Sequence, residues 1–354
     1  MKEIKIEPLP PKVDSESVTI LKQLNKASRT LGQLKGEISK IPNSQILLDT
    51  LTLQEAKDSN EIENIVTTDD EMYQASIDEK VGSVTAKEAL NYSNALITGL
   101  KLVKDKGSLT INDIKSIQHM ISPNHPIRKI PGTVLKNPRT QEVVYTPPQN
   151  YKEIQILLAN LESYINEPEF HDIDALIKMP IIHYQFESIH PFLDGNGRTG
   201  RLLNILYLVQ QGLLDIPVLY LSSYIIKNKS DYYRLLQDVR TKGSWEDWII
   251  WMLIGVEVTA KETIVVVNKI KRLMDDYKKE IRSKFSFYSH DLINILFKHP
   301  YTKNSFLERE LKIHRNTASS YLNTLAEAGL LKKSKIGIFN YYINTSLLQI
   351  LTNR

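Results

Sequence analysis

The amino-acid sequence predicts a mainly α-helical protein with one short β-hairpin and a small C-terminal domain. Two observations carry this prediction. Proline, β-branched and turn residues gather around residues 131–148, which favours a hairpin there. Elsewhere apolar residues recur at helical spacing, beginning with Leu21, Leu24, Leu31 and Leu34.

We expect the chain to divide into three parts, because its 354 residues suggest about two to three domains. Residues 1–90 should form an N-terminal arm and a helical region, residues 91–280 a core, and residues 287–354 a separate domain. The arm should be extended, since its prolines disfavour helix at and before their own positions.

Composition excludes several classes of protein. The chain has no cysteine, which rules out a disulfide scaffold, a thiolate zinc site and a cysteine nucleophile. The N-terminal residues lack the apolar stretch of a signal peptide, and no segment reaches the roughly 18 apolar residues of a membrane span. We therefore expect a cytoplasmic protein with no membrane partner.

The hairpin should span residues 131–148. A turn at residues 136–140 separates two short apolar runs, and Pro147 and Pro148 close the segment. A lone hairpin is marginal in water, so this one must lie against the rest of the molecule.

Residues 190–201 read HPFLDGNGRTGR and join two helical segments that are largely apolar. A glycine-bearing loop thus opens directly into a helix N-terminus, whose unpaired N–H groups and positive dipole end suit phosphate. Gly195 and Gly197 permit positive φ and close backbone approach. Loop glycines usually only make turns. However, Arg198 and Arg201 are unfavourable beside a positive dipole end unless an anion binds there.

Two ionisable side chains of the same segment suit chemistry on a phosphate. Asp194 could hold a hard cation such as Mg²⁺, and His190 could act as a general base. A histidine on an apolar helix is more often a satisfied core residue, and His183 fits that description better.

Taken together, residues 190–201 resemble the signature of the Fic family, HPFx(D/E)GNGRxxR, at every position. Residues 127–148 look like the family's flap, and residues 222–240 look like the segment that follows its active-site helix. The resemblance covers roughly residues 45–280.

The resemblance implies a Fic-fold helical core and an enzyme that transfers AMP from ATP to a Ser, Thr or Tyr hydroxyl of a target protein, which could be the chain itself. It implies that His190 deprotonates this hydroxyl and that Asp194 coordinates Mg²⁺ across the α- and β-phosphates. Asn196, with the backbone of Gly195 and Gly197, would bind the α- and β-phosphates, and Arg198 and Arg201 would hold the outer phosphates.

Two more segments acquire roles from the resemblance. The hairpin would be the flap that registers the modified segment of the target by strand addition, through Thr133, Val134, Leu135, Val143, Val144 and Tyr145. Tyr232 and Tyr233 fall in a region that lines the nucleotide pocket.

A second motif predicts a built-in inhibitor. Ser59, Glu63 and Asn64 match the family pattern [S/T]xxxE[G/N], located N-terminal to the core as in class II members. There the glutamate pairs with the second motif arginine, here Arg201, and blocks the γ-phosphate position. Carboxylates and phosphates both accept a bidentate arginine. The alternative is a solvated acidic helix face.

Residues 287–354 carry nine Lys and Arg against four Asp and Glu. Three short helices and two strands are predicted there, an arrangement similar to a winged helix-turn-helix. We expect duplex DNA as a partner, while a protein-docking or dimerisation module stays open. The expected DNA contacts are Arg315, Asn316, Thr317, Ser319, Ser320, Lys332, Lys333 and Lys335.

Other functions compete with a simple transferase. The chain could be a DNA-binding regulator whose core only senses nucleotide, although a sensor has no need of His190. The same site could also remove AMP, with Glu63 positioning water, as in some relatives. A homodimer is a further assembly that the sequence leaves open.

Overall fold

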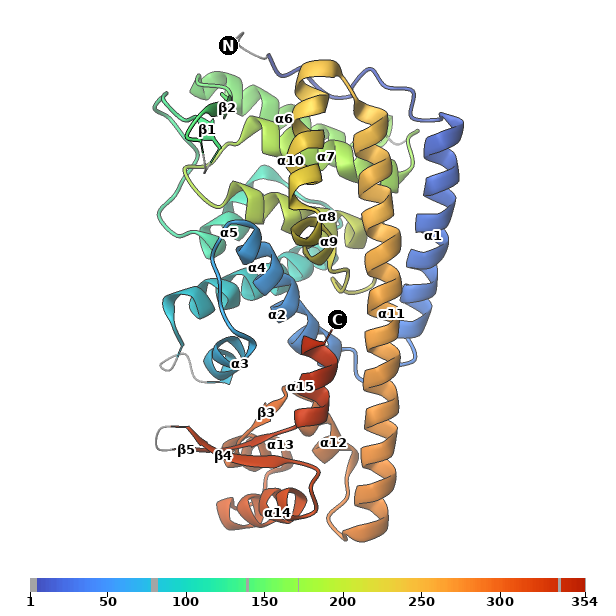
Figure 1. Cartoon of the computed structure of the whole chain (residues 1–354), viewed down its shortest axis with the longest axis vertical. Coiled ribbons are helices and arrows are strands. Elements are labelled where there is room, and N and C mark those ends of the chain that lie inside the picture. The colour runs from blue at the N-terminus through green and yellow to red at the C-terminus, as the bar shows by residue number, and fades with distance from the viewer. Residues whose placement is uncertain (1–4, 78–81, 138–139, 171, 337–338, 354) are drawn as a thin grey trace.

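Helices make up most of the molecule, and the mainly α-helical class is confirmed. The computed structural model describes residues 5–77, 82–137, 140–170, 172–336 and 339–353. A large helical body lies above a smaller C-terminal domain, and the long helix α11 (Trp245–Lys284) runs alongside both (Figure 1). Within those ranges, no helix is both long and apolar enough to cross a membrane.

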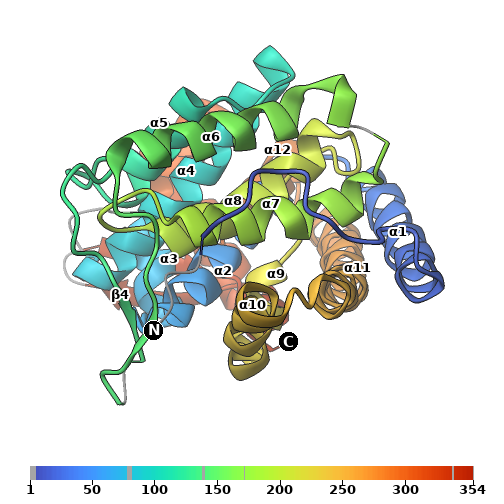
Figure 2. The same ribbon diagram turned by 90° about the horizontal axis from the view of Figure 1, so that it is seen from above.

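Helix α1 (Val18–Ile38) packs along the upper part of α11 (Figure 1). It begins where the proline-containing arm ends, and the Ser17 side chain caps it by accepting a hydrogen bond from the Ile20 N–H at 3.3 Å. The described part of the arm, from residue 5, is not helical and crosses over α7 (Figure 2). Gln185 of α7 donates to the Glu7 carbonyl at 3.0 Å.

The centre of the body is a pair of buried helices, α7 (Ala175–Ile189) and α8 (Asn196–Gln210), with most of their residues inaccessible to solvent. Other helices surround this pair on all sides in Figure 2. Those that pack directly on the pair are α1, α11, α2 (Gln45–Ile62), α4 (Val84–Lys106), α5 (Ile111–Ile121) and α6 (Tyr151–Asn166). The remaining elements of the body are α3 (Asp69–Ile77), the 3-10 turn η1 (Pro168–Phe170), α9 (Leu221–Lys227) and α10 (Lys229–Lys242).

Helix α4 crosses the boundary that was expected between the N-terminal region and the core. It continues unbroken through residue 90, where the N-terminal region was expected to end. The reason is that Ala86, Ala89 and Tyr92 are all buried and keep the helical spacing across that point. The N-terminal region and the core therefore share one continuous hydrophobic core.

The hairpin forms in the expected place but is short. Strand β1 (Leu135–Lys136) pairs antiparallel with β2 (Val143–Tyr145), with Leu135 opposite Tyr145. Two residues of the expected turn, Pro138 and Arg139, lie outside the described residues. The Tyr145 ring is buried under the Arg240 guanidinium at 3.9 Å, and its hydroxyl donates to the Ser188 carbonyl at 2.8 Å. These contacts hold the hairpin against α7, as a lone hairpin requires.

The C-terminal domain contains the three helices and two strands expected, with one extra strand and one extra helix. Its elements are α12 (His290–Lys298), β3 (Tyr301–Thr302), α13 (Asn304–Leu311), α14 (Arg315–Glu327), β4 (Lys332–Ile336), β5 (Phe339–Ile343) and α15 (Thr345–Thr352). The strands form an antiparallel sheet in the order β3-β5-β4. Strand β3 has only two residues, too few for a periodic signal.

This domain docks onto the two helices that flank residues 63–68. Helices α12 and α15 pack against α2, and β3 packs against α3. The Tyr301 hydroxyl hydrogen-bonds to the Asp70 carboxylate, and its ring stacks on Tyr73 with centroids 6.2 Å apart. Lys303 donates to the Ile77 carbonyl at 3.3 Å.

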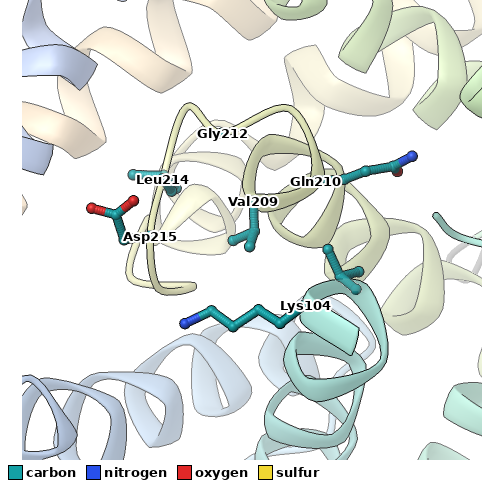
Figure 3. A pocket seen from close by; sticks show the side chains of 7 residues that line it. Lys104, Val209, Gln210, Gly212, Leu214 and Asp215 are labelled. Atoms are coloured by element: carbon teal, nitrogen blue, oxygen red, sulfur yellow. The ribbon is translucent and has the colours of Figure 1, made fainter. Parts of the chain in front are cut away.

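A hollow of about 190 Å³ lies at the C-terminal end of α8 (Figure 3). Its lining includes Lys104, Gln210 and Asp215. Because the glycine-bearing loop is at the opposite end of the same helix, this hollow is separate from the site described next.

Candidate active site

Hydrogen bonds to backbone groups hold the loop between α7 and α8 in one conformation. His190 ends α7 in the left-handed conformation with φ 47°, which is uncommon for a non-glycine residue. Its N–H donates to the Phe186 carbonyl at 3.0 Å, and its own carbonyl accepts from Arg128 Nε at 2.7 Å. The chain thus turns sharply at the proposed base and leaves its side chain partly exposed.

Asn196 closes the loop. Its Oδ1 accepts from the Phe192 N–H at 2.8 Å, and its Nδ2 donates to the Phe192 carbonyl at 2.9 Å. The Phe192 ring is buried in the core. The family resemblance assigns Asn196 to the inner phosphates, but here its amide is used inside the loop. Its contribution in this structure is therefore the shape of the backbone cradle.

Two glycines allow the close approaches that the cradle requires. Gly195 has φ 79°, and a Cβ there would lie 3.0 Å from the Cβ of Ser122. A Cβ at Gly197 would collide with the Glu63 carboxylate. Helix α8 begins without a side-chain cap, so the N–H groups of its first turn are available to an anion.

Arg201 is occupied by the predicted inhibitory segment. Its NH2 donates to Glu63 Oε1 at 2.9 Å and to the Ser59 carbonyl at 2.9 Å, while its Nε donates to Ser59 Oγ at 3.0 Å. The guanidinium is 2% exposed. Burial alone would lower the pKa of Arg201, but the Glu63 carboxylate and other neighbours outweigh this effect and raise it above its ordinary value. Arg201 is therefore charged and held by α2.

The end of α2 explains the Asn64 position of the motif. Asn64 adopts φ 63°, its N–H donates to the Glu61 carbonyl at 2.9 Å, and the Ile65 N–H donates to the Asn60 carbonyl at 3.0 Å. This pair of bonds is a Schellman motif, which needs glycine or asparagine in the left-handed conformation. The turn places Glu63 at the C-cap, directly after the last residue of the helix, where its carboxylate accepts a hydrogen bond from Arg201.

Arg198 is also occupied, but by two carboxylates. NH2 donates to Asp194 Oδ2 at 3.0 Å, and NH1 donates to Glu88 Oε2 at 2.8 Å. The arginine side chain is 5% exposed, and its Nε is buried with no hydrogen-bond partner. Sequence reasoning did not find Glu88, because it lies 110 residues away on α4.

Asp194 suits a hard cation. Burial would raise the pKa of Asp194, but hydrogen bonds from the Ser122 hydroxyl and the Gly195 N–H outweigh it, and the pKa lies below its ordinary value. Ser122 Oγ donates to Oδ2 at 2.6 Å. The described ranges hold no cluster of three or more metal-ligating side chains. A single anionic carboxylate fits Mg²⁺ that keeps its waters and shares substrate phosphates.

The chemistry of His190 follows from its surroundings. Burial, and then the Arg128 guanidinium, lower the pKa of His190 to about 4. Its Nδ1 is buried without a hydrogen-bond partner. The imidazole is therefore neutral near pH 7, the form that can accept a proton.

The two predicted tyrosines have different positions. Tyr232 is buried, and its hydroxyl lies 2.8 Å from Nε2 of His183 inside the core. Tyr233 is 47% exposed and is close enough to influence Arg201 electrostatically. Only Tyr233 can therefore present its ring to a ligand. His183 is fully buried, as expected of a core histidine.

The predicted flap residues also divide into two groups. Val134 and Val144 are exposed, Thr133, Leu135 and Val143 are half-buried, and Tyr145 is buried against α7. Arg128 ties the base of the flap to the loop, because its NH2 donates to the Pro148 carbonyl at 3.0 Å. Nothing in the local spacing marks Arg128 as a site residue, since its partners are backbone carbonyls of distant segments.

The predicted DNA contacts lie in the C-terminal domain, apart from the glycine-bearing loop (Figure 1). Arg315, Asn316 and Ser320 are exposed on α14, and Thr317 and Ser319 are half-buried on the same helix. The exposed lysines are Lys332, Lys333 and Lys335 of the neighbouring strand β4. Lys333 donates to Asn323 Oδ1 at 2.8 Å. The winged helix-turn-helix assignment and its binding of DNA both remain predictions.

Comparison with known families assigns the chain. The Fic/DOC family N-terminal model matches residues 21–101, and the Fic/DOC family model matches residues 108–208. Residues 273–347 match the model of the C-terminal domain of SoFic-like protein adenylyltransferases. The chain belongs to the Fic family.

Curated relatives share limited identity. A protein adenylyltransferase Fic of Drosophila grimshawi is 27% identical over 164 residues, which cover 46% of this chain and 30% of the relative. Its namesake in Drosophila willistoni is 26% identical over 209 residues, which cover 54% of this chain and 40% of the relative. The chain spans less than half the length of these relatives.

Solved structures share the fold. A Fic family protein from Desulfovibrio desulfuricans G20 superimposes with a TM-score of 0.58 and 18% identity, covering 96% of this chain and 98% of that one. Fic-1 from C. elegans, residues 134–508, gives 0.54 and 20%, covering 70% of this chain and 74% of that one.

Proposed function

We propose that this chain is a protein adenylyltransferase that transfers AMP from ATP to a Ser, Thr or Tyr hydroxyl of a protein. The observation that carries the proposal is the join of α7 and α8. A neutral histidine there borders an uncapped helix N-terminus flanked by two arginines. The names of the relatives support the same activity at the level of the family.

The chemistry follows from these positions. The imidazole of His190 accepts the proton of the target hydroxyl, whose oxygen attacks the α-phosphorus of ATP. The bond from the α-phosphorus to the bridging oxygen breaks, and pyrophosphate leaves. The N–H groups at the start of α8 stabilise the developing charge on the inner phosphates, and Arg198 and Arg201 hold the outer ones. Mg²⁺ at Asp194 supplies further charge neutralisation when bound.

Autoinhibition by Glu63 is part of the proposal. The guanidinium that would bind the terminal phosphate already donates to Glu63 Oε1 at 2.9 Å. A carboxylate and a phosphate oxygen compete for the same donors, so both cannot be bound in this geometry. ATP can then reach its productive position only after Glu63 moves away.

The reaction is tested with ATP labelled at the α or the γ phosphate. With Mg²⁺ present, we expect α label on protein and a mass gain equal to AMP, either on the chain itself or on proteins of a cell extract. His190→Ala should abolish the gain. Label from the γ position would contradict adenylylation and indicate phosphate transfer.

A second function, DNA binding by the C-terminal domain, is favoured by the exposed arginine and lysines on α14 and β4. Retention on duplex DNA that falls with rising salt would support it. His190→Ala separates the two classes: a nucleotide-sensing regulator would keep DNA binding and regulation without needing this residue. Removal of AMP by the same site is tested by incubating purified modified protein with the chain and following loss of the AMP mass.

A further inference from the structure

Arg198 donates hydrogen bonds to two carboxylates that come from different segments of the chain. Asp194 belongs to the same loop, four residues before the arginine. Glu88 comes from α4, in the N-terminal region, and reaches NH1 at 2.8 Å. An element outside the signature segment therefore completes the immediate surroundings of a signature residue.

The two carboxylates differ in whether they would keep their hydrogen bonds to Arg198 when a cation binds. Asp194 is 53% exposed and is the residue that would turn to a cation. When its Oδ2 does so, the bond to Arg198 NH2 is lost. The arginine is 5% exposed, and a buried guanidinium without a partner carboxylate is costly. Glu88 is the partner that remains.

Once Asp194 turns to a cation, Arg198 has two donors available for a phosphate. Its Nε is buried and has no hydrogen-bond partner, and NH2 becomes free once Asp194 leaves. With NH1 fixed by Glu88, the Nε–NH2 edge forms a two-pronged donor. Such an edge matches two oxygens of a phosphate.

Glu88 is not explained by the packing of its own helix. The neighbouring residues that α4 buries are Ala86, Ala89 and Tyr92, whereas the Glu88 side chain is 31% exposed. The helix start is satisfied by Ser83, which accepts from the Ala86 N–H at 3.2 Å. Among the described residues, Arg198 is the ion-pair partner of the Glu88 carboxylate.

We propose that Glu88 is a positioning residue that fixes Arg198 in the orientation that receives the outer phosphates of ATP. It acts through Arg198 and does not touch the nucleotide itself. This inference rests on the proposed function, because it assumes that ATP binds at the start of α8.

The test compares nucleotides that do and do not carry outer phosphates. Titration calorimetry with Mg²⁺ measures the affinities for ATP and for AMP in a Glu63→Gly, His190→Ala background, which is open and does not turn over. Adding Glu88→Ala should weaken ATP binding by about tenfold or more, because a charged hydrogen bond to the phosphate edge loses its orientation. AMP binding should change by less than about twofold. Glu88→Gln keeps an acceptor and should fall in between.

Kinetics give a second readout in the Glu63→Gly enzyme. Glu88→Ala should raise the KM for ATP with little change in kcat. The control is Glu262→Ala, which breaks an exposed ion pair between Glu262 and Lys227 at 3.2 Å. It should change the affinity for neither ATP nor AMP. Equal losses for ATP and AMP would show a merely structural role and overturn the inference, as would no change in either. Failure of ATP to bind with Glu88 intact would instead overturn the proposed function, and this inference with it.

Discussion

At the scale of single residues, the site is a set of charges that are already paired. Arg201 donates to Glu63 and Ser59, and Arg198 donates to Glu88 and Asp194. The uncharged member is His190, whose imidazole is kept neutral by burial and by nearby guanidinium groups. Under the proposed function, the base is therefore unprotonated while the phosphate donors are engaged, so we expect release of the arginines to limit activity.

Glu63→Gly should raise modification of the chain itself and of its targets. The substitution removes the carboxylate that occupies Arg201, and a charged hydrogen bond of this kind corresponds to about tenfold or more in rate. Incorporation of α-labelled ATP over time measures the effect. Glu61→Gln, a neighbouring acid on the same helix, is the matched control and should behave as wild type. Equal rates for Glu63→Gly and wild type would contradict the inhibitory role.

The pH dependence of the Glu63→Gly variant should report the unusual pKa of His190. The base must be unprotonated to act, and its pKa is about 4. A lowered pKa keeps the base active through the neutral range, so kcat/KM should be flat from about pH 6 to pH 8 and fall only as the pH approaches about 4. Circular dichroism at each pH shows that the variant is still folded. A fall centred near the ordinary histidine value of 6.5 would show that the surroundings do not depress the pKa.

At the scale of elements, the proposed inhibitory contact between Glu63 and Arg201 depends on how α2 ends. The Schellman turn at residues 60–65 fixes the direction of Glu63, and Asn64 supplies its left-handed residue. Lys229 at the start of α10 donates to Asn64 Oδ1 at 3.2 Å and holds the turn from the other side. The geometry of a helix terminus therefore decides whether the carboxylate meets the guanidinium.

Substitutions at Asn64 should separate backbone conformation from side-chain chemistry. Asn64→Gly retains the positive φ and should remain inhibited, whereas Asn64→Val disfavours it by about 1–2 kcal/mol and should raise activity. Thermal denaturation and the α-label assay on both variants measure the two effects together. Equal activation of Asn64→Gly and Asn64→Val would indicate that the Lys229 contact, which both variants lose, holds Glu63 in place rather than the turn.

At the scale of the whole molecule, the C-terminal domain holds both helices that border the inhibitory turn. Tyr301 bonds to Asp70 and stacks on Tyr73 of α3, while α12 and α15 pack on α2. The last turns of α11 connect this domain to the core through Tyr277, whose hydroxyl donates to the Leu330 carbonyl at 2.6 Å. A domain that is distant in sequence thus packs against the proposed inhibitory segment.

Tyr301→Phe should loosen this support. It removes the hydroxyl bonded to Asp70 and should cost about 1 kcal/mol or more, because a charged acceptor loses its donor. Hydrogen exchange should accelerate in α3 and β3 while α7 and α8 stay protected. Tyr342→Phe is the control, since its hydroxyl donates to Asn323 Oδ1 at 2.8 Å inside the C-terminal domain and its effect should stay there. Unchanged exchange in α3 would show that the domains dock without this bond.

Sequence reasoning could find what is contiguous. The loop of residues 190–201 and the Ser59–Glu63 pattern are local strings, and the structure brings Glu63 to Arg201 as the resemblance implies. It could not find Glu88 or Arg128, because each is defined by a partner more than 60 residues away. Nor could it foresee that the Asn196 amide closes its own loop, since an asparagine can bond to the backbone or to a ligand.

The contact between Glu63 and Arg201 also has a consequence for the time at which activity can first arise. The chain is made from its N-terminus, so Glu63 is synthesised 138 residues before Arg201. At a rate of synthesis of about 5–20 residues per second, this interval lasts many seconds, which is time enough for α2 to form. The carboxylate is therefore present when the second arginine of the loop emerges from the ribosome. The newborn protein never passes through a stage in which the loop is complete and Glu63 is missing.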